Sequence, residues 1–293
     1  MAGLIVRKED GSILFDTQKI TYGLVKSGYM EHQGMYPRFV CVSNACMKDP
    51  SWGGNWEEKG NYNDQVFGFS VANVTAPIVF IVGHGVFAGT SKTGNVTTFN
   101  YSDASAGTKF YCFDLMKDGG AGPALRTYKE DGTLTFNSRQ SPLNIVAAVR
   151  APDPGPRQGV WHALVYTGGY NERYNGTLTP YGSTSYASVR SSVDIPLVGM
   201  GEVAAFLPWS RGVGCAFSTF TEFNYPVGVS VTESCFGGNS KITFSCAISR
   251  TTMGDLSPTS VPMTICFRDI PVDRFPTALV IKTANLPFPF TFN

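Results

Sequence analysis

The side chains that most often carry out catalysis are scattered along this 293-residue sequence. Its three histidines are His32, His84 and His162, and the last two fall in apolar, strand-like runs. There is no His-Glu-x-x-His zinc motif, no Gly-x-Ser-x-Gly nucleophile turn and no Walker loop. Residues 89–94 have the composition of a phosphate loop, but Lys92 precedes the second glycine, so we interpret them as a polar turn. We expect structural histidines, no catalytic residues and no cofactor.

The cysteines and carboxylates also lack the spacing of a reactive site. Seven cysteines at irregular intervals do not indicate a disulfide framework, and Cys41 and Cys46 have no second ligand pair beside them, so we predict no metal site. We expect the cysteines in apolar runs, Cys112, Cys246 and Cys266, to be buried free thiols. A glycosidase needs two facing carboxylates. The sequence reveals no such pair among Glu57, Glu58, Asp64, Asp114 and Asp118.

Two aromatic stretches favour binding over catalysis. The Gly- and Asn-rich segment 50–64 contains Trp52, Trp56 and Tyr62, and loop aromatics of this kind stack on sugars or enter a partner's pocket. Segment 168–188 combines tyrosines with Ser, Gly and Asn, the composition of adaptable contact surfaces. Its tyrosines are Tyr170, Tyr174, Tyr181 and Tyr186. For each stretch the alternative is packing on its own domain, with the tryptophans as lids on the core.

The C-terminal segment, residues 286–293, alternates proline and phenylalanine. The prolines exclude it from a sheet interior. Phe288, Phe290 and Phe292 indicate that it docks on an apolar surface. Docking within the chain and docking on another subunit both remain open from the sequence.

The elements that must position these residues are β-strands, and one hairpin motif occurs twice. The Lys-Glu-Asp-Gly motif at Lys8 recurs at Lys129, an offset of 121 residues (129 minus 8). Asp-Gly between β-prone runs is the signal of a type I′ hairpin turn. In that register Val6 faces Phe15 and Lys8 faces Ile13. We interpret the match as an internal duplication; the alternative is two unrelated hairpins with a common turn.

Short β-prone runs separated by turns predict an all-β fold, and no long window has helical periodicity. The predicted strands are 20–30, 39–42, 65–74, 78–87, 97–101, 108–115, 143–149, 160–166, 203–207, 213–217, 227–231, 242–248, 263–267 and 278–281. We predict two related β-sandwich-like units from the duplication. Residues 1–118 form the first, and residues 119–293 form the second, which is enlarged by insertions and ends in the Phe/Pro-rich segment. The Gly-rich stretch 117–123 marks the boundary.

Composition narrows the function classes. The net charge is +1 and there is no basic run, which argues against nucleic-acid binding. The longest apolar run, 76–89, is interrupted by glycine and histidine and is too short to span a bilayer, so we expect no membrane insertion. The N-terminus lacks a signal-peptide pattern. We therefore expect a chain made and folded in a reducing cytoplasm.

The opening hairpin and the segment 20–28 resemble the start of small tailed-bacteriophage proteins encoded among tail-tip and baseplate genes. Those proteins open with a strand, an Asp/Asn-Gly turn and a strand ending in aspartate, which here is 3–16. Later they carry a Pro-apolar strand and an aromatic-rich closing strand, similar to 76–80 and 110–114. The resemblance covers about residues 1–115, and this chain departs from the family in carrying a second, expanded unit.

The resemblance implies a non-enzymatic structural protein of the virion tail, made in the host cytoplasm. It implies neighbouring tail or baseplate proteins as partners, a homo-oligomer of three or six copies, and host attachment through the loops as a further role. A receptor- or glycan-binding module such as a tail fibre is the second hypothesis, with the aromatic stretches as its contact surface. A polysaccharide-degrading enzyme is the third.

Overall fold

The computed structural model describes residues 5–7, 9–11, 13–16, 19–41, 56–120, 122–158, 162–175, 187–218, 226–249, 252–256, 266–268 and 270–292. These residues form an all-β fold, as the sequence predicts, and no helix long and apolar enough to cross a membrane is found among them. The first strands are β1 Ile5–Arg7, β2 Ile13–Asp16, β3 Tyr22–Tyr29, β4 Glu31–Cys41, β5 Trp56–Ala72, β6 Ile78–Val82, β7 Val86–Thr93, β8 Val96–Ser102, β9 Lys109–Leu115, β10 Arg126–Tyr128, β11 Leu134–Asn137 and β12 Ala147–Arg150. The later strands are β13 Arg157–Gln158, β14 His162–Ala163, β15 Tyr170–Asn175, β16 Ala187–Pro196, β17 Val203–Phe206, β18 Gly212–Ser218, β19 Pro226–Gly237, β20 Lys241–Ala247, β21 Thr252–Leu256, β22 Cys266–Arg268, β23 Thr277–Lys282 and β24 Phe290–Thr291.

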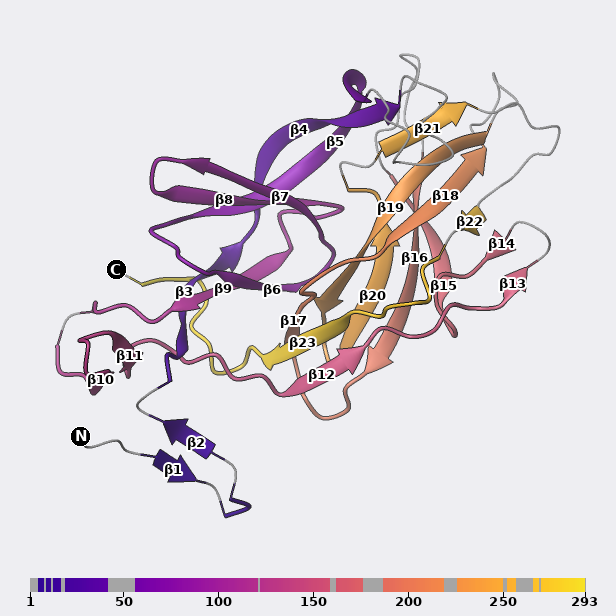
Figure 1. Ribbon diagram of the computed structural model, residues 1–293. Helices are drawn as coiled ribbons and strands as arrows, with labels where there is room; N and C mark the ends of the chain where they lie inside the picture. Colours follow the sequence, from indigo (N-terminus) through magenta and orange to yellow (C-terminus); the bar gives the residue numbers. More distant parts are fainter. Residues whose placement is uncertain are drawn as a thin grey trace.

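Most of these strands belong to one large, curled sheet (Figure 1). The sheet is mixed, because β19 runs parallel to β6 and β21 runs parallel to β4, whereas its other ladders are antiparallel. Three small antiparallel sheets stand apart from it among the described residues: β1–β2, β10–β11 and β13–β14.

The two Asp-Gly hairpins have the same geometry. β1 pairs with β2, and β10 with β11, in registers that match at the 121-residue offset (126 minus 5) and carry a bulge at the same step. Gly11 and Gly132 have φ values of 81° and 82°, whereas no aspartate at these turns has a positive φ. The predicted type I′ turn is therefore wrong. A bulge places Arg7, not Lys8, opposite Ile13, and only glycine takes the left-handed conformation.

After each hairpin the chain builds the same row of three strands. β9 lies between β3 and β6 in the first row, and β23 lies between β12 and β17 in the second. In the first row, Cys112 of β9 pairs with Lys26 on one side and Val79 on the other. In the second row, Val280 of β23 pairs in the same way with Ala147 and Ala205. Lys26 and Ala147 are again 121 positions apart (147 minus 26). The offset that relates the two hairpins therefore also relates β3 to β12.

A second layer of strands also follows one order twice. The strands that lie in the chain between those of the first row pair in the order β4-β5-β8-β7, and those between the strands of the second row pair in the order β15-β16-β20-β19. β5 pairs with β8 from Phe67 to Ala72, and β16 pairs with β20 from Ser191 to Pro196, a ladder of equal length. In the second layer, β18 and β22 continue beyond β19.

The two rows meet edge to edge. Ala205 of β17 pairs antiparallel with Ile81 of β6, and the rings of Phe80 and Phe206 lie beside this bridge with their centroids 5.7 Å apart. Phe80 follows Val79 and Phe206 follows Ala205, so these phenylalanines hold equivalent places and face each other.

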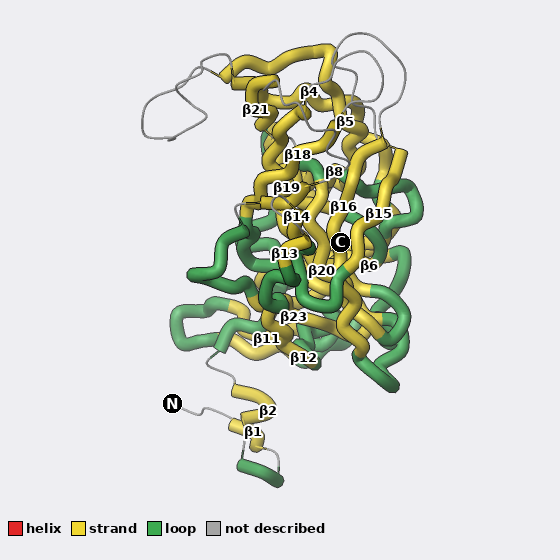
Figure 2. The backbone as a smooth tube through the Cα atoms, turned by 90° about the vertical axis from the view of Figure 1, so that its right-hand side faces the viewer, coloured by secondary structure: helices red, strands yellow, loops and turns green. Residues whose placement is uncertain are grey.

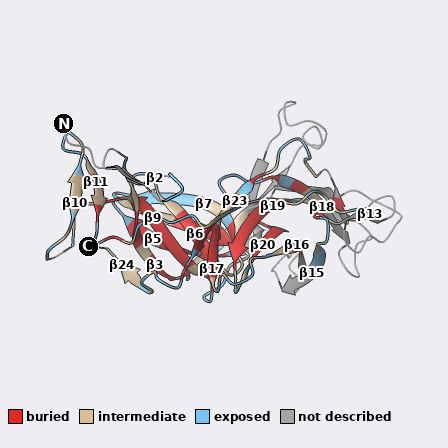
Figure 3. Cartoon of the chain, turned by 90° about the horizontal axis from the view of Figure 1, so that it is seen from below, coloured by how far each residue is buried: buried red, intermediate tan, exposed pale blue. Residues whose placement is uncertain are grey.

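Three apolar clusters fill the fold, and the buried residues run through its middle strands (Figure 3). One cluster lies between the first row and β5 and β8, where Phe69 and Phe110 stack 3.6 Å apart. A second lies between the second row and β16, β19 and β20. The third spans both rows, because it includes Phe80 and Tyr111 from one and Ala204 and Ile281 from the other. This shared core joins the two rows into one body, seen from the side in Figure 2.

The C-terminal segment docks within the chain. β24 pairs antiparallel with β3, and Phe292 donates its backbone N–H to Val25 at 2.9 Å. The Phe288 ring packs on Tyr29 and Tyr111, with centroids 5.0 and 5.7 Å away. β24 pairs with β3 alone among the described strands, so it lies at a sheet edge, where prolines are tolerated.

Three expectations about loops were wrong. β5 begins at Trp56, so the part of segment 50–64 from 56 onward is strand. β4 pairs with this part of β5, and ladder hydrogen bonds stabilise a polar sequence there. Residues 89–93 belong to β7, and the turn follows at Gly94. His84 lies between β6 and β7, not in a strand.

Candidate functional site

The junction of the two rows is the floor of an apolar pocket of about 410 Å³, which we call the junction pocket. Val79 and Ile81 line it from β6, and Ala205 and Leu207 line it from β17 and its end. Alternate residues of a strand face the same side, so these side chains point away from Phe80 and Phe206. The volume lies within the range of ligand pockets in proteins.

Aromatic side chains frame the junction pocket. Phe87 of β7, Phe99 and Tyr101 of β8, and Trp209 in the loop between β17 and β18 all line it. Phe87 is 51% exposed and Trp209 is 43% exposed, whereas Phe99 and Tyr101 are buried. The Phe87 and Tyr101 rings meet edge to face at 5.6 Å. Two exposed rings therefore stand beside an apolar cavity that is already formed.

Glu233, which lines the junction pocket, belongs to a buried ion pair with Arg211. Arg211 donates from Nη2 to Oε1 and from Nε to Oε2 of Glu233, both at 2.8 Å. Tyr166 donates its hydroxyl to Oε1 of Glu233 at 3.0 Å, and burial raises the Tyr166 pKa well above its usual value, which keeps that proton in place. Both carboxylate oxygens already accept hydrogen bonds, so Glu233 offers a ligand little free charge. The pocket suits an apolar group.

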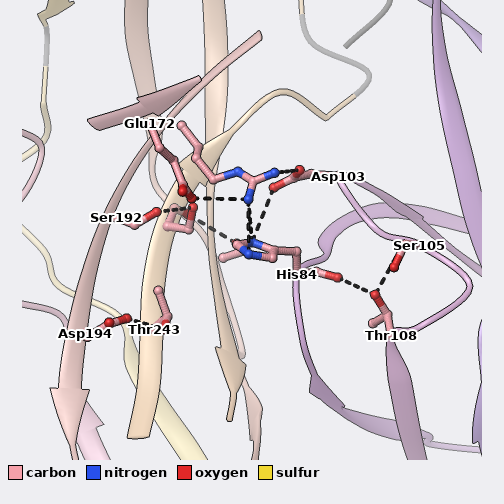
Figure 4. A network of polar contacts seen from close by, with 11 residues as sticks. His84, Asp103, Ser105, Thr108, Glu172, Ser192, Asp194 and Thr243 are labelled. Carbon is pink, nitrogen blue, oxygen red and sulfur yellow. Dashed lines mark hydrogen bonds and ion pairs between the residues drawn. The ribbon is translucent and has the colours of Figure 1, made fainter. Parts of the chain in front are cut away.

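A second polar group, the seam cluster, links the two halves of the chain (Figure 4). His84 and Asp103 come from the first half, and Glu172 and Arg190 come from the second. Arg190 Nη2 donates to Asp103 Oδ1 at 2.6 Å, and Arg190 Nη1 lies 3.2 Å from Glu172 Oε1. Nη1 also lies 3.0 Å from Nδ1 of His84. The Thr108 hydroxyl donates to the His84 carbonyl at 2.8 Å and fixes the loop that carries the imidazole.

Burial moves two pKa values in the seam cluster in opposite directions. It lowers the pKa of His84 to about 4, and the positive charge of Arg190 adds to this effect. It raises the pKa of Asp103 to about 7, against the opposing effect of Arg190. Near neutral pH the imidazole is therefore neutral and accepts from the guanidinium. The guanidinium of Arg190 thus holds the His84 imidazole in a hydrogen-bonded network.

The shifted pKa values predict opposite pH dependences for two variants. Asp103 binds a proton more readily when folded, so its contribution to stability grows as pH falls from about 7 to about 4. His84 binds a proton less readily when folded, so its contribution is lost as pH falls from 6.5 towards about 4. On acidification from pH 7 to 5, Asp103→Asn should lose more stability than the wild type, and His84→Gln should lose less.

Urea unfolding at both pH values checks this prediction. The change in the free energy of unfolding is compared between each variant and the wild type. Parallel pH dependences in all three proteins would contradict the assignment of the two shifts.

The aromatic residues singled out from the sequence are dispersed. Trp52, Tyr181 and Tyr186 lie outside the described residues. Trp56 and Tyr62 fall in β5 and Tyr174 in β15, where the structure describes the backbone. Tyr170 begins β15 and is 41% exposed. Tyr170, the one of these residues whose side chain is described, does not line the junction pocket, and Phe288, Phe290 and Phe292 belong to the docked C-terminal segment.

Sequence reasoning missed the residues that frame the junction pocket. The sequence did contain a signal for Trp209. Pro208-Trp209-Ser210 lies in a loop between two predicted strands, where an aromatic side chain is not placed in the core by strand alternation. Phe87 gave no signal, since it continues the apolar run that begins at Ile78.

The rest of the described chain adds no metal centre. No group of three or more His, Cys, Asp or Glu residues in that part is placed to hold an ion. Cys112 and Cys235 are buried free thiols, Cys246 is buried as well, and burial raises the pKa of Cys112 to about 12. Comparisons of the chain with protein-family models, with curated proteins and with solved structures found no match.

Proposed function

We propose that this chain is a non-enzymatic structural component of a bacteriophage tail tip or baseplate, where it holds neighbouring tail proteins and contacts the host surface through its loops. The observation that carries the proposal is the junction pocket: a preformed apolar cavity between two exposed aromatic rings, in a body with a shared core. A cavity of this kind accepts an apolar side chain from a partner, as the anchor positions of protein interfaces do. The resemblance of the opening segment to tail-tip proteins supplies the context.

We propose further that the fold arose by internal duplication into two related β-sandwich-like units, residues 1–118 and 119–293. The equal hairpin registers, the repeated rows and the repeated second layer support this origin. If the two hairpins were similar only by chance, the strands of the two rows and of the second layer would not be expected to follow the same order in both halves of the chain. In the virion, three or six copies around the tail axis remain the expected arrangement.

Incorporation into virions tests the function. Trp209→Ala and Phe87→Ala remove the rings beside the junction pocket without emptying a core, because both side chains are substantially exposed. Loss of an interface anchor costs about 2 kcal/mol or more, which corresponds to roughly 30-fold weaker binding. Each variant is supplied in place of the wild-type chain during phage growth, and the amount in purified particles is measured by quantitative immunoblot.

The control is Val198→Ala, which truncates a side chain that is 91% exposed and does not line the pocket. Normal incorporation of both ring variants would show that the pocket is not a partner contact. Absence of the wild-type chain from purified particles would refute the tail assignment itself.

A receptor- or glycan-binding module is the second candidate. The observation in its favour is the exposed Trp209 ring, since tryptophan faces stack on sugar rings. Glycan-array binding that is lost in Trp209→Ala, or in Trp52→Ala or Trp56→Ala, would favour it. Release of product from purified host polysaccharide would instead favour an enzyme.

A further inference from the structure

The outer edges of the two equivalent rows differ. β24 covers the outer edge of β3 in the first row. β12 is the equivalent strand of the second row, and among the described strands it pairs with β23 alone (Figures 1 and 2). An edge strand exposes unpaired N–H and C=O groups that can pair with another chain.

The ladder between β12 and β23 shows which backbone groups of β12 point away from β23. Ala151 donates its N–H to the Pro276 carbonyl at 2.9 Å. Hydrogen-bonded positions alternate along an antiparallel strand, so Val149 also points its amide towards β23. Ala148 and Arg150 therefore point their amides outward, and both residues are exposed.

The first row shows how this edge is used. Ser27, which lies 121 positions before Ala148 (148 minus 27), pairs with Phe290 of β24. β12 thus has the same outward groups as β3 but no described strand to receive them. Ala147-Ala148-Val149-Arg150 contains neither proline nor lysine and its ladder with β23 has no bulge, so the only devices that protect this edge are its four-residue length and the charge of Arg150.

We propose that β12 is the contact between two copies of this chain in solution, which pair through antiparallel β12 strands across a two-fold axis. The fold itself contains the precedent, since the equivalent strands β6 and β17 already pair edge to edge in this way. β24, at the opposite edge of the sheet, is less suited to pair with a second copy, because it has only two residues and follows Pro289. The pairing concerns the free chain and does not depend on the proposed tail function.

One register satisfies the outward groups of both copies. Ala148 of each copy pairs with Arg150 of the other, and the two Val149 residues face each other without hydrogen bonds. Each guanidinium then lies opposite a small side chain, so no like charges face each other directly. The two Val149 α-carbons are expected to lie about 4.5 Å apart, the spacing of a non-hydrogen-bonded pair.

Ala148→Pro tests the contact. Proline is tolerated at an edge position whose N–H faces solvent, so the bond pattern between β12 and β23 is kept while the outward donor is lost. The mass in solution is measured by light scattering over a dilution series. The wild type is expected to reach twice the chain mass of 31.7 kDa, and Ala148→Pro is expected to stay at the single-chain mass. The control Ala148→Ser keeps the donor and is expected to behave as the wild type.

Two results of this series would overturn the proposal: a wild type with the single-chain mass at every concentration, or an Ala148→Pro protein that still doubles its mass. A second variant decides the matter if Ala148→Pro does not fold. Val149→Cys should form a disulfide between copies on mild oxidation, because its α-carbons are within disulfide range. The wild type, with its native cysteines, and Ala148→Cys are expected to show no such product, and equal cross-linking in all three would refute the register.

Discussion

Glu233→Ala is expected to lower the free energy of unfolding by about 3–5 kcal/mol, the cost of leaving one partner of a buried ion pair uncompensated. Glu233 and Arg211 are both buried, and the substitution removes two hydrogen bonds from the guanidinium and one from the Tyr166 hydroxyl. Urea unfolding monitored by tryptophan fluorescence measures the change.

The matched control is Asp153→Ala, which breaks the ion pair with Arg150 at the surface. That pair is exposed on both sides and its nitrogen–oxygen distance is 3.4 Å, so its loss should cost less than about 1 kcal/mol. Replacing both buried partners, as in Arg211→Met with Glu233→Leu, should recover much of the stability, since apolar replacements leave no unpaired charge. Equal costs for Glu233→Ala and Asp153→Ala would contradict the buried pairing.

Gly237→Ala is the second substitution with a large expected effect. Gly237 ends β19, pairs with Val82 of β6 and accepts a hydrogen bond from the Gly83 amide at 3.0 Å. A Cβ at this position would collide with the carbonyl group of Val203, which is backbone and cannot turn away. We expect a loss of about 3 kcal/mol, the upper end of overpacking costs, because the collision separates β19 from the junction of the rows.

Gly212→Ala provides the matched control, since a Cβ there meets nothing within 4 Å. Its thermal midpoint should stay close to that of the wild type, while that of Gly237→Ala should fall by several degrees. A normal midpoint for Gly237→Ala would mean that β19 does not approach β17 as closely as described.

Local patterns in the sequence predicted much of the fold. Asp-Gly turns and β-prone runs located both hairpins and most strands, because these features depend on neighbouring residues. The turn type was wrong, since a bulge changes the register by one residue without changing the local composition. β5 was partly missed because its first residues are polar, and their pairing with β4 outweighs that composition.

Long-range pairing limited the prediction of the candidate site. The junction pocket depends on β6 meeting β17, and the seam cluster joins His84 to Arg190, which are 106 residues apart in the sequence. No local pattern reports such contacts. The second copy of the hairpin gave the one long-range clue, because it indicated that two similar sets of strands had to be packed together.

Immunogold labelling of purified virions, with antibody raised against this chain, tests the proposed function most directly. The proposal predicts gold clustered at the distal end of the tail, with weaker labelling in particles grown with Trp209→Ala. Virions without label, with the chain present only in the lysate, would contradict it.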